Sequence, residues 1–158
     1  MKNKDLIESF SGIRGIYGKT ITENFAEKYT FVFGNWLANK LGKPAIIIGC
    51  DTRPSSEELK KAMIEALASL GCKIIDVGIA STPAISYGVR EYGCEGGIII
   101  TASHNEPEYN GWKFLWRDGA LLRPDQIKEV IEAVHKTKRL PGPMVLNRVA
   151  PKPKAEIV

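Results

Sequence analysis

The sequence predicts an α/β domain of three layers (α/β/α), in which helices cover both faces of a mixed, mainly parallel sheet. Short apolar runs alternate with amphipathic segments of helical length, a pattern typical of parallel strands joined by helices. The dipeptide Asp118-Gly119 follows a segment of alternating hydrophobicity and predicts a hairpin, so one strand is expected to be antiparallel. We therefore expect about four strands plus this hairpin.

The first predicted helix begins after Thr22, a residue type that favours the N-cap position, and ends at Gly42. Between them, apolar side chains recur at the spacing of an amphipathic helix. We assign this stripe to the core rather than to a cofactor site. It comprises Phe25, Tyr29, Val32, Phe33, Trp36, Leu37 and Leu41.

Two buried strands and a second helix are expected next. Residues 45–48 and 73–77 are apolar runs of strand length. Between these runs, Ser55 and Glu58 have the spacing of a capping box. We therefore expect the Ser55 side chain to cap a helix that ends at Gly71.

The second half of the chain continues the alternation. Thr82-Pro83 predicts the start of a short helix that ends at Gly93. Residues 97–101 form a third apolar run, and residues 112–116 alternate as a half-buried strand.

The last predicted helix runs from Pro124 to about Lys138 and has one apolar face. His135 lies at the edge of that face, and we expect it to be solvent-exposed near the helix C-terminus rather than catalytic. Residues 140–158 carry four prolines. We therefore assign residues 1–139 to one domain and residues 140–158 to a linker or the start of a further domain.

Composition indicates an ordinary globular chain. With 158 residues, 44% hydrophobic and 25% charged, it is long enough for one core. The formal net charge of +4 is modest and the lysines are scattered, which favours anionic ligands weakly and predicts no nucleic-acid partner. No apolar stretch approaches about 18 residues, and the first residues are polar, so we expect no signal peptide and no membrane partner.

The cysteines also bear on the compartment. Cys50, Cys72 and Cys94 are an odd number without a CxxC pair, which fits neither a disulfide framework nor a zinc site. A reducing, cytoplasmic location is therefore expected.

A polar segment follows the third apolar run and carries the candidate chemistry. Ser103 lies just beyond the expected carboxyl end of that strand, the edge at which open α/β sheets bind ligands. A serine hydroxyl needs activation to act as a nucleophile, and His104 and Lys113 are the local candidates. The alternative is a surface turn in which Ser103 and Asn105 bond their own backbone.

Residues 101–105 together with residues 109–113 closely resemble the active-site serine loop of the α-D-phosphohexomutases, the family of phosphoglucomutases, phosphomannomutases and phosphoglucosamine mutases. Residues 10–15 and 49–56 also match family segments, in the expected order. Two departures stand out. The first of these segments is two residues shorter than the usual family loop, and Glu106 stands where the family usually has proline.

The resemblance implies a fold and a mechanism. It implies the same three-layer domain, with Ser103 as the carrier of a phosphoryl group. The implied catalytic residues are Ser103, His104, Lys113 and Arg14, and the implied substrate-binding residues are Asn105, Asn110 and Arg53.

Arg53 has two possible roles. Residues 50–56 and 101–113 both leave expected strand ends, so Arg53 should lie beside the serine loop. It would then either contact substrate or, together with Asp51, only hold the loops together.

The resemblance further implies Mg²⁺, with one ligand in this chain, a phosphate oxygen on Ser103. It implies a phosphorylated hexose substrate and a hexose 1,6-bisphosphate intermediate or activator. The remaining metal ligands, the sugar-reading loop and the second phosphate site are expected from other domains of the same enzyme, because their family motifs do not occur in these 158 residues. The isolated chain is therefore expected to be inactive.

The sequence leaves one alternative function open and disfavours two others. One alternative is a non-catalytic, mutase-like domain that serves as a phosphate-binding or partner module. Residues 12–20 are spaced wrongly for a P-loop by one residue and lack a preceding strand. A serine hydrolase is disfavoured because no GxSxG motif is present.

Overall fold

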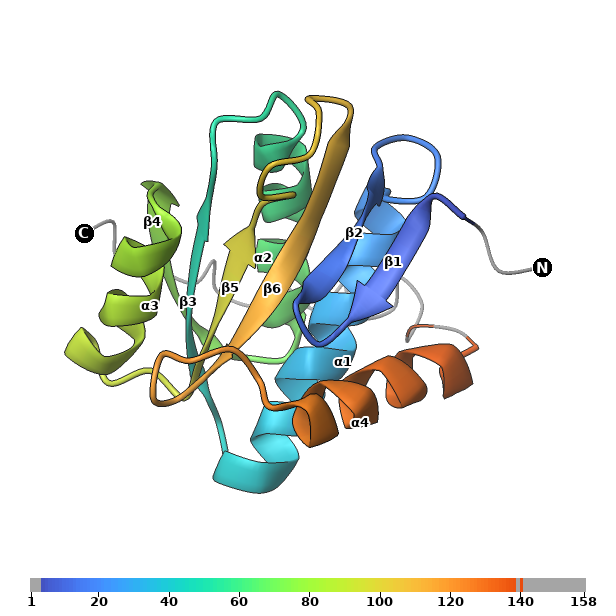
Figure 1. Ribbon diagram of the computed structural model, residues 1–158. Coiled ribbons are helices and arrows are strands. Elements are labelled where there is room, and N and C mark those ends of the chain that lie inside the picture. Colours follow the sequence, from blue (N-terminus) through green and yellow to red (C-terminus); the bar gives the residue numbers. More distant parts are fainter. Residues whose placement is uncertain (1–3, 139, 141–158) are drawn as a thin grey trace.

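A computed structural model describes residues 4–138 and residue 140 and shows the predicted three-layer α/β/α arrangement (Figure 1). One six-stranded sheet has the order β1-β2-β6-β5-β3-β4. The strands are β1 (Leu6–Ser9), β2 (Gly12–Ile16), β3 (Ala45–Cys50), β4 (Lys73–Ile79), β5 (Gly96–Ile100) and β6 (Tyr109–Trp116). The helices are α1 (Glu23–Leu41), α2 (Ser56–Ser69), α3 (Thr82–Glu91) and α4 (Pro124–Lys136).

The sheet is mixed, as predicted, and its directions divide it in two. Strand β3 pairs in parallel with β4 and β5. Strand β6 is antiparallel to β5 and to β2, and β1 is antiparallel to β2. The expected antiparallel addition is thus β6 itself. The turn at Asp118-Gly119 leads only to an isolated bridge between Leu115 and Leu121, not to a further strand.

Two short strands at the start of the chain were not predicted. Strands β1 and β2 have four and five residues and are largely half-buried, so no apolar run marks them. Strand β1 is held to two helices through Glu8, whose carboxylate accepts a hydrogen bond from the hydroxyl of Tyr29 and lies 2.9 Å from Nε2 of His135. His135 is exposed, as expected.

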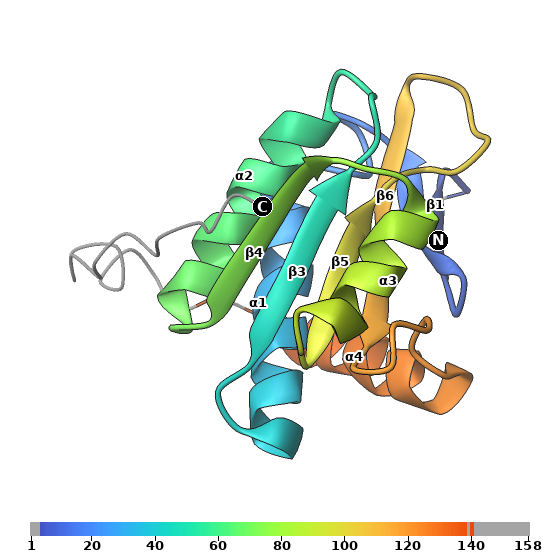
Figure 2. The same ribbon diagram turned by 90° about the vertical axis from the view of Figure 1, so that its left-hand side faces the viewer.

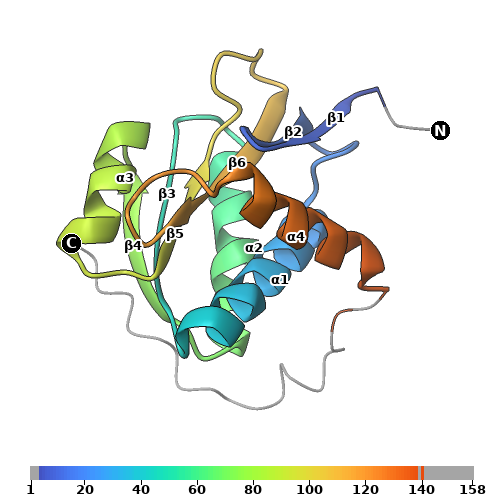
Figure 3. The ribbon, with the colours of Figure 1, turned by 60° about the horizontal axis from the view of Figure 1, so that its bottom comes forward.

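The helices cover both faces of the sheet, because neighbouring strand residues point to opposite sides. Ile46 and Ile48 of β3 pack in the larger core with α1, α2 and α4, whereas Ile47 packs with α3. Figures 2 and 3 show α3 alone on one face and the other three helices on the opposite face.

The predicted helix ends are partly confirmed. The Thr22 hydroxyl accepts a hydrogen bond of 3.2 Å from the backbone N–H of Phe25, and Gly42 closes α1 with φ of 78°. The predicted capping box at Ser55 and Glu58 is wrong. Ser55 has helical backbone angles and makes no capping bond, because its hydroxyl accepts from Asn110 instead.

Other assignments follow from the same structure. Residues 12–16 form strand β2, so the rejected P-loop does not exist as a strand–loop–helix unit. Helices α3 and α4 start within the expected segments, and α4 ends at Lys136 rather than Lys138. The expected linker lies outside the described residues apart from Leu140. No helix in the described part of the chain combines the length and the apolar character needed to cross a membrane.

We expect this chain to unfold in a single cooperative transition, because one continuous core joins α1, α2 and α4 to the sheet.

Burial raises the pKa of the Cys72 and Cys94 thiols to about 11. A thiol reagent at pH 8 should therefore react with neither until the chain unfolds. The raised pKa values of these thiols contribute to the free energy of unfolding below pH 9. This contribution is lost as the pH rises toward 11, because only the unfolded thiols ionise in that range.

The measurement is urea unfolding followed by far-ultraviolet circular dichroism, tryptophan fluorescence and thiol reactivity. The three curves should coincide. Separated midpoints, or rapid reaction of Cys72 and Cys94 in the native protein, would contradict a single cooperative transition.

Candidate active site

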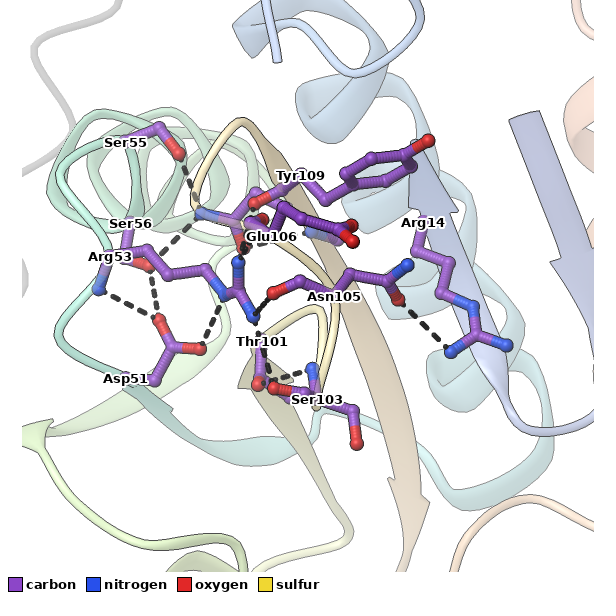
Figure 4. A network of polar contacts seen from close by, with 12 residues as sticks. Arg14, Asp51, Arg53, Ser55, Ser56, Thr101, Ser103, Asn105, Glu106 and Tyr109 are labelled. Carbon is purple, nitrogen blue, oxygen red and sulfur yellow. Dashed lines mark hydrogen bonds and ion pairs between the residues drawn. The ribbon is translucent and has the colours of Figure 1, made fainter. Parts of the chain in front are cut away.

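Two loops and strand β2 meet at one edge of the sheet and build the candidate site (Figure 4). Residues 101–108 leave the carboxyl end of β5, and residues 51–55 leave the carboxyl end of the neighbouring parallel strand β3. Strand β2 adds Arg14, which pairs in register with Gly111 of β6. The segments that carry the family resemblance, far apart in the chain, therefore lie together.

Ser103 lies at the start of the serine loop, which we define as residues 101–109. It is exposed, and it is the one non-glycine residue with positive φ, 58°, in the described part of the chain. Its backbone N–H donates to Oγ1 of Thr101 at 3.0 Å. No described residue hydrogen-bonds the Ser103 hydroxyl, which points away from Arg53 in Figure 4. The hydroxyl is therefore available to an external ligand rather than bonded within a turn.

Arg53 lies beside the serine loop, as expected, and its contacts are with the protein. Its side chain is 11% exposed and Nε donates to Oδ2 of Asp51 at 3.1 Å. Both terminal nitrogens donate to backbone carbonyls of the serine loop. Nη2 contacts Ser103 at 3.0 Å and Asn105 at 2.8 Å, and Nη1 contacts Glu106 at 2.7 Å and Tyr109 at 3.1 Å.

Asn110, predicted to bind substrate, is fully buried with 0% exposure, and its side chain hydrogen-bonds to other residues of the chain. Its amide nitrogen donates to the hydroxyls of Ser55 at 2.8 Å and Ser56 at 3.0 Å. Its amide oxygen accepts from the N–H of Gly111 at 2.8 Å. Ser56 in turn donates to Asp51 at 2.8 Å. Asn110 therefore fixes the start of β6 to the start of α2.

The remaining candidate residues keep their charge or polarity available. Arg14 makes one long hydrogen bond of 3.3 Å, from Nη1 to the side-chain oxygen of Asn105. Arg14, Ser103 and Lys113 line the same small cleft, which also includes Ser11. His104 is exposed in the serine loop. Within the described residues, none of the three basic side chains forms an ion pair with a carboxylate. The site therefore favours an anion.

Ser11 was not identified from sequence, although it belongs to the matched segment 10–15. Its hydroxyl lies 2.9 Å from that of Ser9, and both belong to the β1–β2 hairpin that the sequence did not reveal. Knowledge of that hairpin would have placed Ser11 at the site.

Tyr17 borders the same edge of the sheet, where its N–H donates to the carbonyl of Glu108 at 2.8 Å. Its hydroxyl donates to Glu23, and this hydrogen bond is the main cause that raises the pKa of Tyr17 to about 12. The phenol therefore stays protonated at neutral pH and does not act as a base.

The residues present do not form a complete magnesium site. Magnesium prefers several oxygen ligands, and carboxylates usually supply some of them. In residues 4–138 and 140, no three His, Cys, Asp or Glu side chains are grouped so that they could hold a metal ion. Asp51, the carboxylate beside the serine loop, is occupied by Arg53 and Ser56.

Known proteins share this fold. Residues 7–140 match the family model for phosphoglucomutase/phosphomannomutase, alpha/beta/alpha domain I. A phosphoglucomutase/phosphomannomutase of Thermococcus kodakarensis is 47% identical over 116 residues, which cover 73% of this chain and 25% of that protein. A phosphoglucosamine mutase of Clostridium kluyveri is 39% identical over 133 residues, which cover 82% of this chain and 30% of that protein.

A solved structure agrees. The phosphoglucomutase/phosphomannomutase family protein of Burkholderia thailandensis superimposes with a TM-score of 0.70 at 29% identity, over 81% of this chain and 30% of that one. The fold and these matches define the class as an N-terminal domain of the phosphohexomutase family. The chain belongs to the phosphoglucomutase/phosphomannomutase family and corresponds to its first domain. It spans 25% and 30% of the length of the two relatives.

Replacing Asn110 by Ala should lower the free energy of unfolding by about 1–3 kcal/mol, because it leaves buried hydroxyls and an N–H without their partner. The measurement is urea unfolding, with Asn39→Ala as the control, since Asn39 is exposed on α1. Equal stabilities for the two variants would show that the Asn110 bonds contribute nothing.

Proposed function

We propose that this chain is the phosphate-carrying domain of an enzyme that interconverts hexose 1-phosphates and hexose 6-phosphates. One observation carries the proposal. The Ser103 hydroxyl has no hydrogen-bond partner among the described residues and faces a cleft shared with Arg14 and Lys113, neither of which is paired with a carboxylate there. A phosphoryl group is the anion that such an arrangement suits, since it brings about −1.5 to −2 charges.

In the proposed cycle, Ser103 begins as a phosphoserine. A hydroxyl oxygen of the hexose phosphate attacks the phosphorus while the bond from phosphorus to Ser103 Oγ breaks. The product is a bisphosphorylated hexose. Lys113, the proposed proton shuttle, would give a proton to the departing Ser103 Oγ and take the proton of the attacking hydroxyl, so that Ser103 is left as a free hydroxyl and Lys113 regains its charge. After the sugar turns over, its other phosphate returns to Ser103 by the same step in reverse.

The basic side chains have distinct proposed tasks. Phosphoryl transfer depends mainly on positioning and on stabilising charge as it spreads over the transferring oxygens. Arg14, held loosely through Asn105, is proposed to contact those oxygens. His104, exposed next to the serine, is proposed to contact the phosphoryl group or the sugar. Asn105 is proposed to aim Arg14, and this is the contact that the structure supports best.

Magnesium is assigned one ligand in this chain, an oxygen of the phosphate on Ser103, and when bound it would offset the negative charge of that group. The donor set described above does not complete its coordination. The remaining ligands, the groups that read the sugar and the second phosphate site are therefore proposed to belong to other domains of the same enzyme, whose relatives extend well beyond this chain.

In the whole enzyme, we expect phosphate to be found on Ser103. Intact mass should show an addition of roughly 80 Da, and peptide mapping should place it on this residue. Ser103→Ala should abolish both the label and mutase activity, whereas Ser69→Ala, a change at an exposed serine on α2, should alter neither. Phosphate on Ser55 or Ser56, with Ser103→Ala active, would overturn the assignment.

The 158-residue chain alone should show no mutase turnover, even with magnesium and a hexose 1,6-bisphosphate. Loss of one preorganised charge-stabilising donor commonly costs about 10² to 10³ in rate, and several are supplied elsewhere. A coupled assay from glucose 1-phosphate or mannose 1-phosphate measures this, with Ser103→Ala as the control. Ordinary turnover that the control abolishes would show that the chain is self-sufficient.

A further inference from the structure

We propose that Arg53 is a positioning residue for phosphoryl transfer. Its guanidinium holds the backbone of the serine loop in the conformation that presents Ser103 to the phosphosugar. This inference rests on the proposed function and deepens it, since it assigns the group that fixes the geometry of the reacting serine.

The contacts are concentrated on one side chain. Arg53 donates to four loop carbonyls, those of Ser103, Asn105, Glu106 and Tyr109, at 2.7 to 3.1 Å. The serine loop makes only two backbone–backbone hydrogen bonds within itself, Asn105 to Ala102 and Tyr109 to Glu106. The arginine therefore determines the path of the loop more than the loop's own turns do.

The loop needs such an anchor because Ser103 is strained. A left-handed backbone conformation is unfavourable for a residue other than glycine. The carbonyl of this same residue accepts from Nη2 of Arg53, and its N–H donates to Thr101. These two contacts hold the Ser103 backbone from both sides and offset the strain.

The contacts also orient the peptide dipoles. In a trans peptide the carbonyl and the following N–H point in opposite directions, and no peptide bond of the described residues is cis. Because the Ser103 and Asn105 carbonyls point at Arg53, the N–H groups of His104 and Glu106 point away from it. Neither N–H has an acceptor in residues 4–138 and 140. Carbonyl oxygens, which would repel a phosphate, are thus gathered on the far side from the Ser103 hydroxyl.

Arg53 itself has little left to offer a substrate. Nε is bonded to Asp51, and each terminal nitrogen contacts two carbonyls. Its charge is offset by Asp51, whereas Arg14 contacts only a neutral amide. Loss of Arg53 should therefore affect the reaction step, not substrate affinity.

The experiment compares Arg53→Ala and Arg53→Lys with Arg123→Ala. Arg123 is a matched control, because it is also paired with an aspartate two residues away but is exposed. Lysine keeps the charge but lacks the planar set of donors that reaches several carbonyls. In this chain, amide chemical shifts of the serine loop are recorded with and without about 20 mM guanidinium, far below the denaturing range. In the whole enzyme, kcat and KM are measured under the same conditions.

We expect Arg53→Ala to shift the amides of the serine loop and to lower kcat about 100-fold with little change in KM, since a misplacement of about 1 Å costs that much. Guanidinium should return the amide chemical shifts of Arg53→Ala to their wild-type values and restore at least part of kcat. The same concentration of NaCl should do neither. Arg53→Lys should have a kcat and amide shifts between those of Arg53→Ala and the wild type, and Arg123→Ala should match the wild type in both.

Three results would overturn the proposal. A raised KM with unchanged kcat would make Arg53 a substrate ligand. A lower urea midpoint with unchanged kcat would make its role merely structural, and unshifted amides would remove the role entirely. If the wild-type enzyme neither turns over nor carries phosphate on Ser103, the proposed function fails, and the amide shifts with guanidinium still report separately whether Arg53 holds the loop.

Discussion

A single guanidinium, that of Arg53, joins the loops that leave the carboxyl ends of β3 and β5. The rest of the site depends on this junction. The parallel pairing of β3 and β5 brings the two loop starts together, and Asp51 orients the arginine. Asn110 then ties the far end of the serine loop to the start of α2. Buried polar networks of this kind are costly if incomplete, so each member constrains the others.

The two arginines at this edge divide the electrostatic tasks. Arg53 is largely buried and its charge is offset by Asp51, so it acts on the protein backbone. Arg14 stands on β2, which pairs antiparallel with β6, and contacts only the amide of Asn105. Asn105 lies between them, with its carbonyl on Arg53 and its side chain on Arg14. A change in the position of one arginine would therefore be transmitted to the other through Asn105.

Much of the fold could be predicted from the sequence because the residues that mark its strands and helix ends lie within short segments of the chain. The isoleucine runs of β3 and β5 and the Thr22 cap depend on neighbours in the chain. The short strand β1 was missed because no apolar run marks it, while its pairing with β2 and the Glu8 contacts with distant helices depend on the folded structure. The sequence predicts that the Ser55 side chain caps a helix, but the Ser55 hydroxyl accepts a hydrogen bond from Asn110, which is remote in sequence. The burial of Asn110 belongs to the same network of contacts between distant segments, so it could not be predicted.

The central claim is that Ser103 carries the phosphate that is transferred, and a pulse-chase measurement tests it most directly. The whole enzyme is labelled with radioactive phosphate and mixed rapidly with unlabelled hexose 1-phosphate. We expect label to leave Ser103 at least as fast as the enzyme turns over and to appear in hexose bisphosphate and hexose 6-phosphate. Label that stays on Ser103 while product accumulates would show that Ser103 does not carry the transferred phosphate.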